Sequence, residues 1–133
     1  MPDYEKYIAG HRQQLAREKE KLAQLTRQAM DKAKEAAQQL ACRYRVEKVY
    51  LFGSLAVGGF DEESDIDLAV CGLSDEKYLK AYGLVESIAL PFNVDLISLE
   101  SAADTLKARV EREGIVLYDR RTAVPKPDRS GLK

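Results

Sequence analysis

The sequence predicts a small α/β or α+β fold in which one sheet carries helices on one face. Three features lead to this prediction: a long amphipathic N-terminal segment, four short runs rich in β-branched and aromatic residues, and two helical segments between those runs. With 133 residues, the chain is most simply one domain with a modest core. Its 45% hydrophobic and 32% charged residues are typical of a globular protein.

The N-terminal segment is predicted to form one long helix over about residues 11–44. Its apolar residues recur at helical spacing, and they are Leu15, Leu22, Leu25, Ala29, Ala33, Ala36 and Leu40. The stripe is narrow and rich in alanine, which permits close packing, and we expect it to pack against the chain's own domain. The helix is also long enough for self-association or for contact with a partner. Its basic residues alternate with Glu, which indicates a solvated face rather than a phosphate site.

The elements that follow are predicted in the order β, β, α, β, α, β. Strands are expected at residues 46–52, 65–70, 93–99 and 115–118. A Ser-Asp-Glu opening predicts a helix over residues 74–90, and residues 101–113 form another that stops at Gly114. The tail is punctuated by prolines, and we expect it to be disordered. The chain therefore divides into an N-terminal helix (1–44), a domain (45–119) and a tail (120–133).

Composition excludes several classes of function. The formal net charge of -1 argues against a nucleic acid or a membrane as the partner. No apolar run approaches the length of a membrane span, and the N-terminus lacks the apolar core of a signal peptide. Cys42 and Cys71 lack metal-like spacing and are expected to be reduced thiols of a cytoplasmic protein. His11 is the one histidine in the sequence, which excludes histidine-based triads and zinc sites.

Three aspartates occupy strand positions at which a carboxylate is unfavourable. Asp65 and Asp67 are one residue apart in a predicted strand, so both side chains point to the same face. Asp95 lies in the next predicted strand, which could pair beside the first. Clustered carboxylates raise one another's pKa, and a divalent cation reverses that penalty. Oxygen ligands without a nearby histidine or thiolate select Mg²⁺ or Mn²⁺, and such cations usually act on phosphates.

A Gly-Ser pair follows the first predicted strand. At Gly53 the missing Cβ lets a ligand approach the backbone. Ser54 can begin a short helix that presents amide groups and a hydroxyl to an anion. Such turns are common, and the pair gains weight from its position between a strand and the Asp-x-Asp strand.

Gly53-Ser54, ten intervening residues and Asp65-x-Asp67 together resemble the signature of the DNA polymerase β-like nucleotidyltransferase superfamily. The stretches LFGSLAVG, SDIDLAV, NVDLISL and EGIVLY are similar, more closely, to the minimal nucleotidyltransferase (MNT) family, the antitoxin partners of HEPN ribonucleases. The resemblance covers about residues 46–118. It implies an α+β fold, with a small mixed sheet and helices on one face, preceded here by the long helix.

The resemblance also implies roles for the site residues. Asp65 and Asp67 would hold two Mg²⁺ ions and the phosphates of ATP, and Asp95 would complete the metal site and help to deprotonate the acceptor hydroxyl. Gly53 and Ser54 would grip the β- and γ-phosphates. In family members with this activity, AMP is transferred from ATP to a tyrosine of the HEPN toxin, which silences the toxin.

One position departs from the family pattern. Many members read Gly-Ser-x-Ala-Arg-Gly, whereas this chain has Val57 in place of the arginine, with Lys48 and Lys77 as conceivable substitutes. Two functions therefore stay open: an adenylylating antitoxin, and an inactive MNT-type module that neutralises its HEPN partner by masking it. A carboxylate-based nuclease or a phosphorelay receiver is a third interpretation, and it leaves Gly53-Ser54 unexplained.

Overall fold

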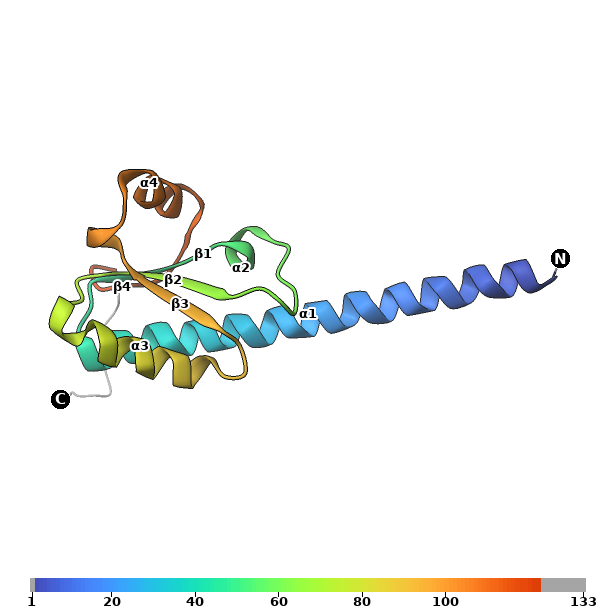
Figure 1. Ribbon diagram of the computed structural model, residues 1–133, viewed down its shortest axis with the longest axis horizontal. Helices are drawn as coiled ribbons and strands as arrows, with labels where there is room; N and C mark the ends of the chain where they lie inside the picture. The colour runs from blue at the N-terminus through green and yellow to red at the C-terminus, as the bar shows by residue number, and fades with distance from the viewer. Residues whose placement is uncertain (1, 123–133) are drawn as a thin grey trace.

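A computed structural model describes residues 2–122 of the chain (Figure 1). The part of the predicted tail from residue 123 onward lies outside the described residues. The helices are α1 (Pro2–Tyr44), α2 (Ser54–Val57), α3 (Asp75–Ala89) and α4 (Asp104–Glu113), with a short 3-10 turn η1 (Leu99–Ser101). The strands are β1 (Lys48–Phe52), β2 (Ile66–Cys71), β3 (Val94–Ser98) and β4 (Ile115–Asp119).

The four strands form one mixed sheet in the order β3-β2-β1-β4. Strand β1 is antiparallel to both β2 and β4, whereas β2 and β3 are parallel. The parallel pair requires a crossover, and α3 supplies it. The predicted mixed sheet and the predicted fold class are confirmed.

Helix α1 begins well before its predicted start, and Pro2 occupies the first helical position, where its missing N–H costs nothing. Its buried side chains begin at Ala29 and include Ala33 and Leu40. The N-terminal half therefore projects from the sheet as a single helix (Figure 1), with Leu15 and Leu22 49% and 40% exposed. Among the described residues, none of the helices combines the length and apolar character needed to cross a membrane.

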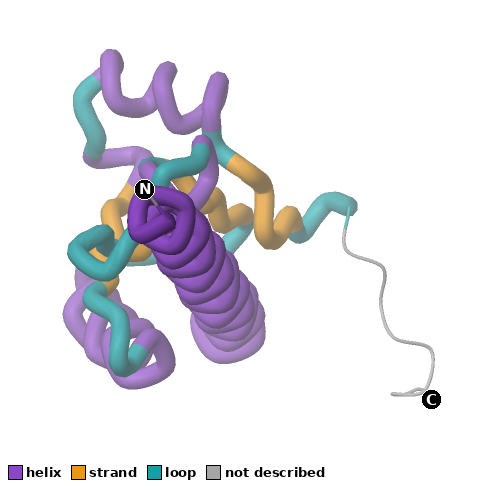
Figure 2. The backbone as a smooth tube through the Cα atoms, turned by 90° about the vertical axis from the view of Figure 1, so that its right-hand side faces the viewer, coloured by secondary structure: helices purple, strands orange, loops and turns teal. Residues whose placement is uncertain are grey.

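Helices cover both faces of the sheet. The inward residues of β1 and β2, such as Val49, Leu51 and Leu68, pack against α1 and α3. Tyr50 and Phe52 point to the other face and pack with Val110 of α4, so α4 lies on the opposite side (Figures 1 and 2). This differs in one detail from the expectation of helices on one face. Tyr50 and Phe52 on one face of β1 are apolar like Val49 and Leu51 on the other, so the second face also has to be covered.

Candidate active site

The turn after β1 requires glycine for two separate reasons. Gly53 has φ 75° and ψ −158°, a backbone conformation that is essentially confined to glycine. A Cβ at Gly53 would also lie 2.2 Å from Oδ2 of Asp67. The turn continues into α2, where the amides of Ala56 and Val57 each donate to the Gly53 carbonyl at 3.0 Å. Ser54, the first residue of α2, is half-buried.

Sheet register brings two of the three predicted aspartates together. Asp67 is the β2 partner of Phe52 on one side and of Asp95 in β3 on the other. Both aspartates alternate with residues that face α1 and α3, so they lie on the α4 side of the sheet. Asp67 is half-buried and Asp95 is exposed. The carboxylate pair therefore stands at the sheet end where β1 enters the Gly53 turn.

The third aspartate, Asp65, lies one residue before β2 and is exposed. It is two residues from Asp67, so the extended backbone directs the two side chains to the same side. Asp65 also acts electrostatically on Asp67. The structure thus places it at the rim of the site, next to the Asp67–Asp95 pair.

The surroundings of Asp67 disfavour its ionised form. The pKa of Asp67 is raised from 3.8 to about 6, chiefly by burial and then by the neighbouring charges of Asp95 and Asp65. Arg109 of α4 opposes this shift. Burial and the two neighbouring carboxylates thus disfavour the ionised form of Asp67, a penalty that a bound cation would reverse.

The donor set fits a hard divalent cation. The three side chains offer oxygen ligands, the type that Mg²⁺ prefers. Within residues 2–122, no group of three or more His, Cys, Asp or Glu side chains is already gathered closely enough to hold a metal ion. A cation at this place would be held by Asp67 and Asp95, which are register partners, together with Asp65, and the three side chains would have to close around it.

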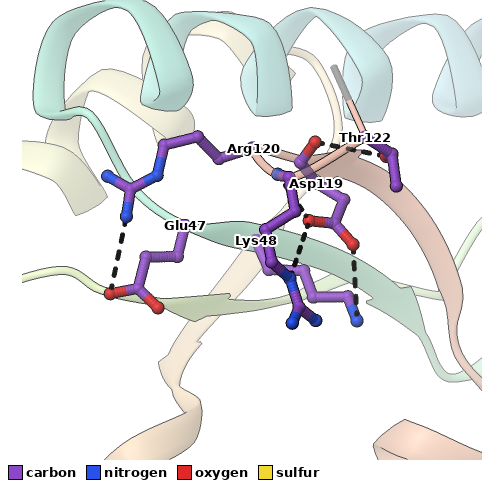
Figure 3. A network of polar contacts seen from close by, with 6 residues as sticks. Glu47, Lys48, Asp119, Arg120 and Thr122 are labelled. Carbon is purple, nitrogen blue, oxygen red and sulfur yellow. Dashed lines mark hydrogen bonds and ion pairs between the residues drawn. The ribbon is translucent and has the colours of Figure 1, made fainter.

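Neither lysine considered from the sequence takes the place of the missing arginine. Lys48 lies at the other end of β1, about 13 Å from Phe52 at the usual rise of a strand. It is paired there with Asp119 at 3.7 Å, beside the contact between Glu47 and Arg120 (Figure 3). Lys77 is exposed in the first turn of α3. This helix follows Cys71, the end of β2 that pairs with Lys48, so Lys77 also lies at the end of the sheet away from Asp67.

Two kinds of site residue escaped the sequence reasoning. Arg109 comes from α4, distant in sequence, and its charge acts on Asp67 because α4 covers the same face of the sheet; its ion pair is with Glu113. Tyr82 of α3 donates a hydrogen bond to Oδ1 of Asp95 at 3.2 Å. The one available signal was the spacing of Tyr78 and Tyr82, which places two tyrosines on one face of a predicted helix.

Comparison with known proteins agrees with this geometry. The family described as "Polymerase beta, Nucleotidyltransferase" matches residues 32–123. The protein adenylyltransferase MntA of Shewanella oneidensis is 33% identical over 76 residues, which cover 56% of this chain and 55% of MntA. A Methanocaldococcus jannaschii chain assigned as a protein adenylyltransferase is 30% identical over 95 residues, covering 64% of this chain and 93% of that one.

Among solved structures, a toxin–antitoxin complex with AMP-PNP contains a chain that superposes with a TM-score of 0.56 and 30% identity. The match covers 65% of this chain and 73% of that one. The present chain thus spans about half the length of the Shewanella relative and nearly all of the Methanocaldococcus relative. The family match includes the Gly53 turn and all three aspartates, which confirms the resemblance seen in the sequence: the chain belongs to the polymerase beta nucleotidyltransferase family.

Proposed function

We propose that the chain is a Mg²⁺-dependent adenylyltransferase that transfers AMP from ATP to a tyrosine hydroxyl of a HEPN toxin and thereby acts as its antitoxin. The observation that carries the proposal is the registered pair Asp67–Asp95, in which Asp67 packs against Gly53. The names of two relatives as protein adenylyltransferases, and the toxin–antitoxin complex with AMP-PNP, support the choice of nucleotide and of partner.

Each residue has a task in this reaction. Gly53 lets the triphosphate approach the backbone, and the Ser54 hydroxyl donates to a phosphate oxygen. Asp65, Asp67 and Asp95 would hold two Mg²⁺ ions, which neutralise phosphate charge when bound. Asp95 accepts the proton of the acceptor hydroxyl. The hydroxyl oxygen then forms a bond to the α-phosphorus, the bond from that phosphorus to the bridging oxygen breaks, and pyrophosphate leaves.

The acceptor comes from a second polypeptide in this proposal. The projecting half of α1 exposes Leu15 and Leu22, one heptad apart. Helices in proteins gain most of their stability from packing of an apolar face, and these two leucines lack such packing within the chain. We propose that this segment mediates contact with a second protein, either the toxin or another copy of the chain. Light scattering of the full chain, alone and with the toxin, distinguishes these two outcomes.

The direct test is label transfer from ATP to the toxin in the presence of Mg²⁺. The wild-type chain is expected to label a toxin tyrosine, and the double variant Asp65→Ala/Asp67→Ala is expected to lose the transfer. Equal transfer by the double variant, or none by the wild type, would contradict an enzymatic antitoxin. Full neutralisation of the toxin by the double variant would instead support the alternative function, in which the chain masks its partner.

A further inference from the structure

Two tyrosines of α3 hold the outer edge of the sheet. Strand β3 is an edge strand whose inner side bonds to β2. Tyr78 donates its hydroxyl to the carbonyl of Leu96, and Tyr82 donates to the carbonyl of Val94 at 3.1 Å. The two rings meet edge to face, with centroids 5.8 Å apart and an interplanar angle of 79°. The position of each hydroxyl is thus fixed by the packing of α3 on β3.

The two tyrosines differ in one contact. The Tyr82 hydroxyl also lies 3.2 Å from Oδ1 of Asp95, the carboxylate that faces Asp67 across the parallel register. Tyr78 lies one helical turn earlier and bonds to the backbone of β3. The Tyr82 hydroxyl therefore contacts both the β3 backbone and Asp95, whereas the Tyr78 hydroxyl contacts the backbone, so Tyr78 serves as a control residue for Tyr82.

We propose that Tyr82 is a positioning residue for Asp95, and this inference rests on the function proposed above. Asp95 is exposed on an edge strand, so its side chain on its own would sample several rotamers. The single hydroxyl proton of Tyr82 is shared between the Val94 carbonyl and Oδ1 of Asp95; in this role it would restrain Oδ1 and leave Oδ2 for the cation or for the acceptor proton. Hydrogen-bond partners of ligand side chains orient the ligand, and their loss commonly weakens metal binding or activity about 10- to 100-fold.

The alternative role for Tyr82 is that of an acceptor within the same chain. Its hydroxyl is close to Asp95, as an acceptor must be. However, the hydroxyl is shared with the Val94 carbonyl, and the ring is half-buried against Tyr78. These contacts hold the hydroxyl in place, which favours positioning over self-modification.

The test compares Tyr82→Phe with Tyr78→Phe, since each keeps the ring and loses one backbone hydrogen bond. Binding of Mn²⁺ is measured by electron paramagnetic resonance without nucleotide, so that neither turnover nor chelation of the ion by a free triphosphate contributes. We expect Y82F to bind Mn²⁺ about 10-fold or more weakly than wild type, and Y78F to bind within about 2-fold of wild type. Urea unfolding of both variants shows whether they lose similar stability.

Three results would overturn the positioning role: wild-type affinity for Mn²⁺ in Y82F, an equal loss in Y78F, or adenylyl groups found on Tyr82 by mass spectrometry. A different result tests the proposed function. If the wild-type chain binds no Mn²⁺, or if Asp67→Asn leaves binding unchanged, the metal-dependent function fails irrespective of Tyr82.

Discussion

Replacement of Gly53 by alanine is the sharpest test of how the site is built. The first cost is conformational, because φ 75° with ψ −158° is a region that costs a non-glycine residue about 1–3 kcal/mol. The second is steric, because the new Cβ would lie 2.2 Å from Oδ2 of Asp67. Asp67 would have to move by about 1 Å to restore an ordinary contact. The variant should therefore lose stability and also displace the central carboxylate.

Alanine variants of two other glycines distinguish the conformational cost from the steric cost. Gly59 has φ 89°, and a Cβ added there would have no other atom within 4 Å, so Gly59→Ala carries backbone strain without a clash. Gly83 lies inside α3 with open space around it, so Gly83→Ala should stabilise the chain by about 0.5–1 kcal/mol. Urea unfolding gives the free energies, and calorimetric titration with AMP-PNP and Mn²⁺ gives the nucleotide affinity.

We expect G53A to be less stable than wild type by about 1–3 kcal/mol and to lose most nucleotide binding. G59A should lose stability and keep its binding. If G53A bound the nucleotide as G59A does, the contact between the turn and Asp67 would have no part in the site. If G53A matched G83A in stability, the backbone assignment at Gly53 would be wrong.

Three further predictions concern charge and length. Between pH 3.8 and about 6, the folded chain keeps a proton on Asp67 that the unfolded chain has released. The free energy of unfolding of the metal-free protein should therefore fall as the pH rises through that window. Urea titrations should show a weaker pH dependence in Asp67→Asn, and an unchanged pH profile in that variant would refute the reasoning. Arg109→Ala should weaken ATP affinity about 2- to 5-fold. Arg112→Ala removes the same charge beside the same Glu113 and should leave the affinity unchanged. Val57→Arg should restore the affinity of R109A, since Val57 is 60% exposed and has room for the longer side chain. Deleting residues 2–20 should change the free energy of unfolding by less than about 0.5 kcal/mol, because the buried side chains of α1 begin at Ala29; a larger loss would mean that the projecting half supports the core.

The strands and part of the candidate site could be predicted from short stretches of the sequence. Runs of β-branched and aromatic residues indicated the strands, and the Gly53-Ser54 turn with Asp65 and Asp67 at their spacing indicated the site, because strand propensity and turn chemistry depend on neighbouring residues. The positions of Tyr82 and Arg109 depend on how α3 and α4 pack on the sheet, and short-range periodicity carries no record of that packing. The placement of α4 on the second face was missed for a related reason. A strand that is apolar on both sides shows that cover is needed, without showing which helix provides it.

The tyrosine contacts along β3 also restrict how a partner can approach. A protein that adds a strand to a sheet needs backbone carbonyl and amide groups that are free at the edge. At β3 the carbonyls of Val94 and Leu96 already accept hydrogen bonds from Tyr82 and Tyr78. This edge is therefore protected against strand addition, including unwanted pairing between copies of the chain. In the proposed reaction, the acceptor polypeptide would therefore bring its hydroxyl to Asp95 without adding a strand to β3; among the described residues, the other edge strand of the sheet is β4.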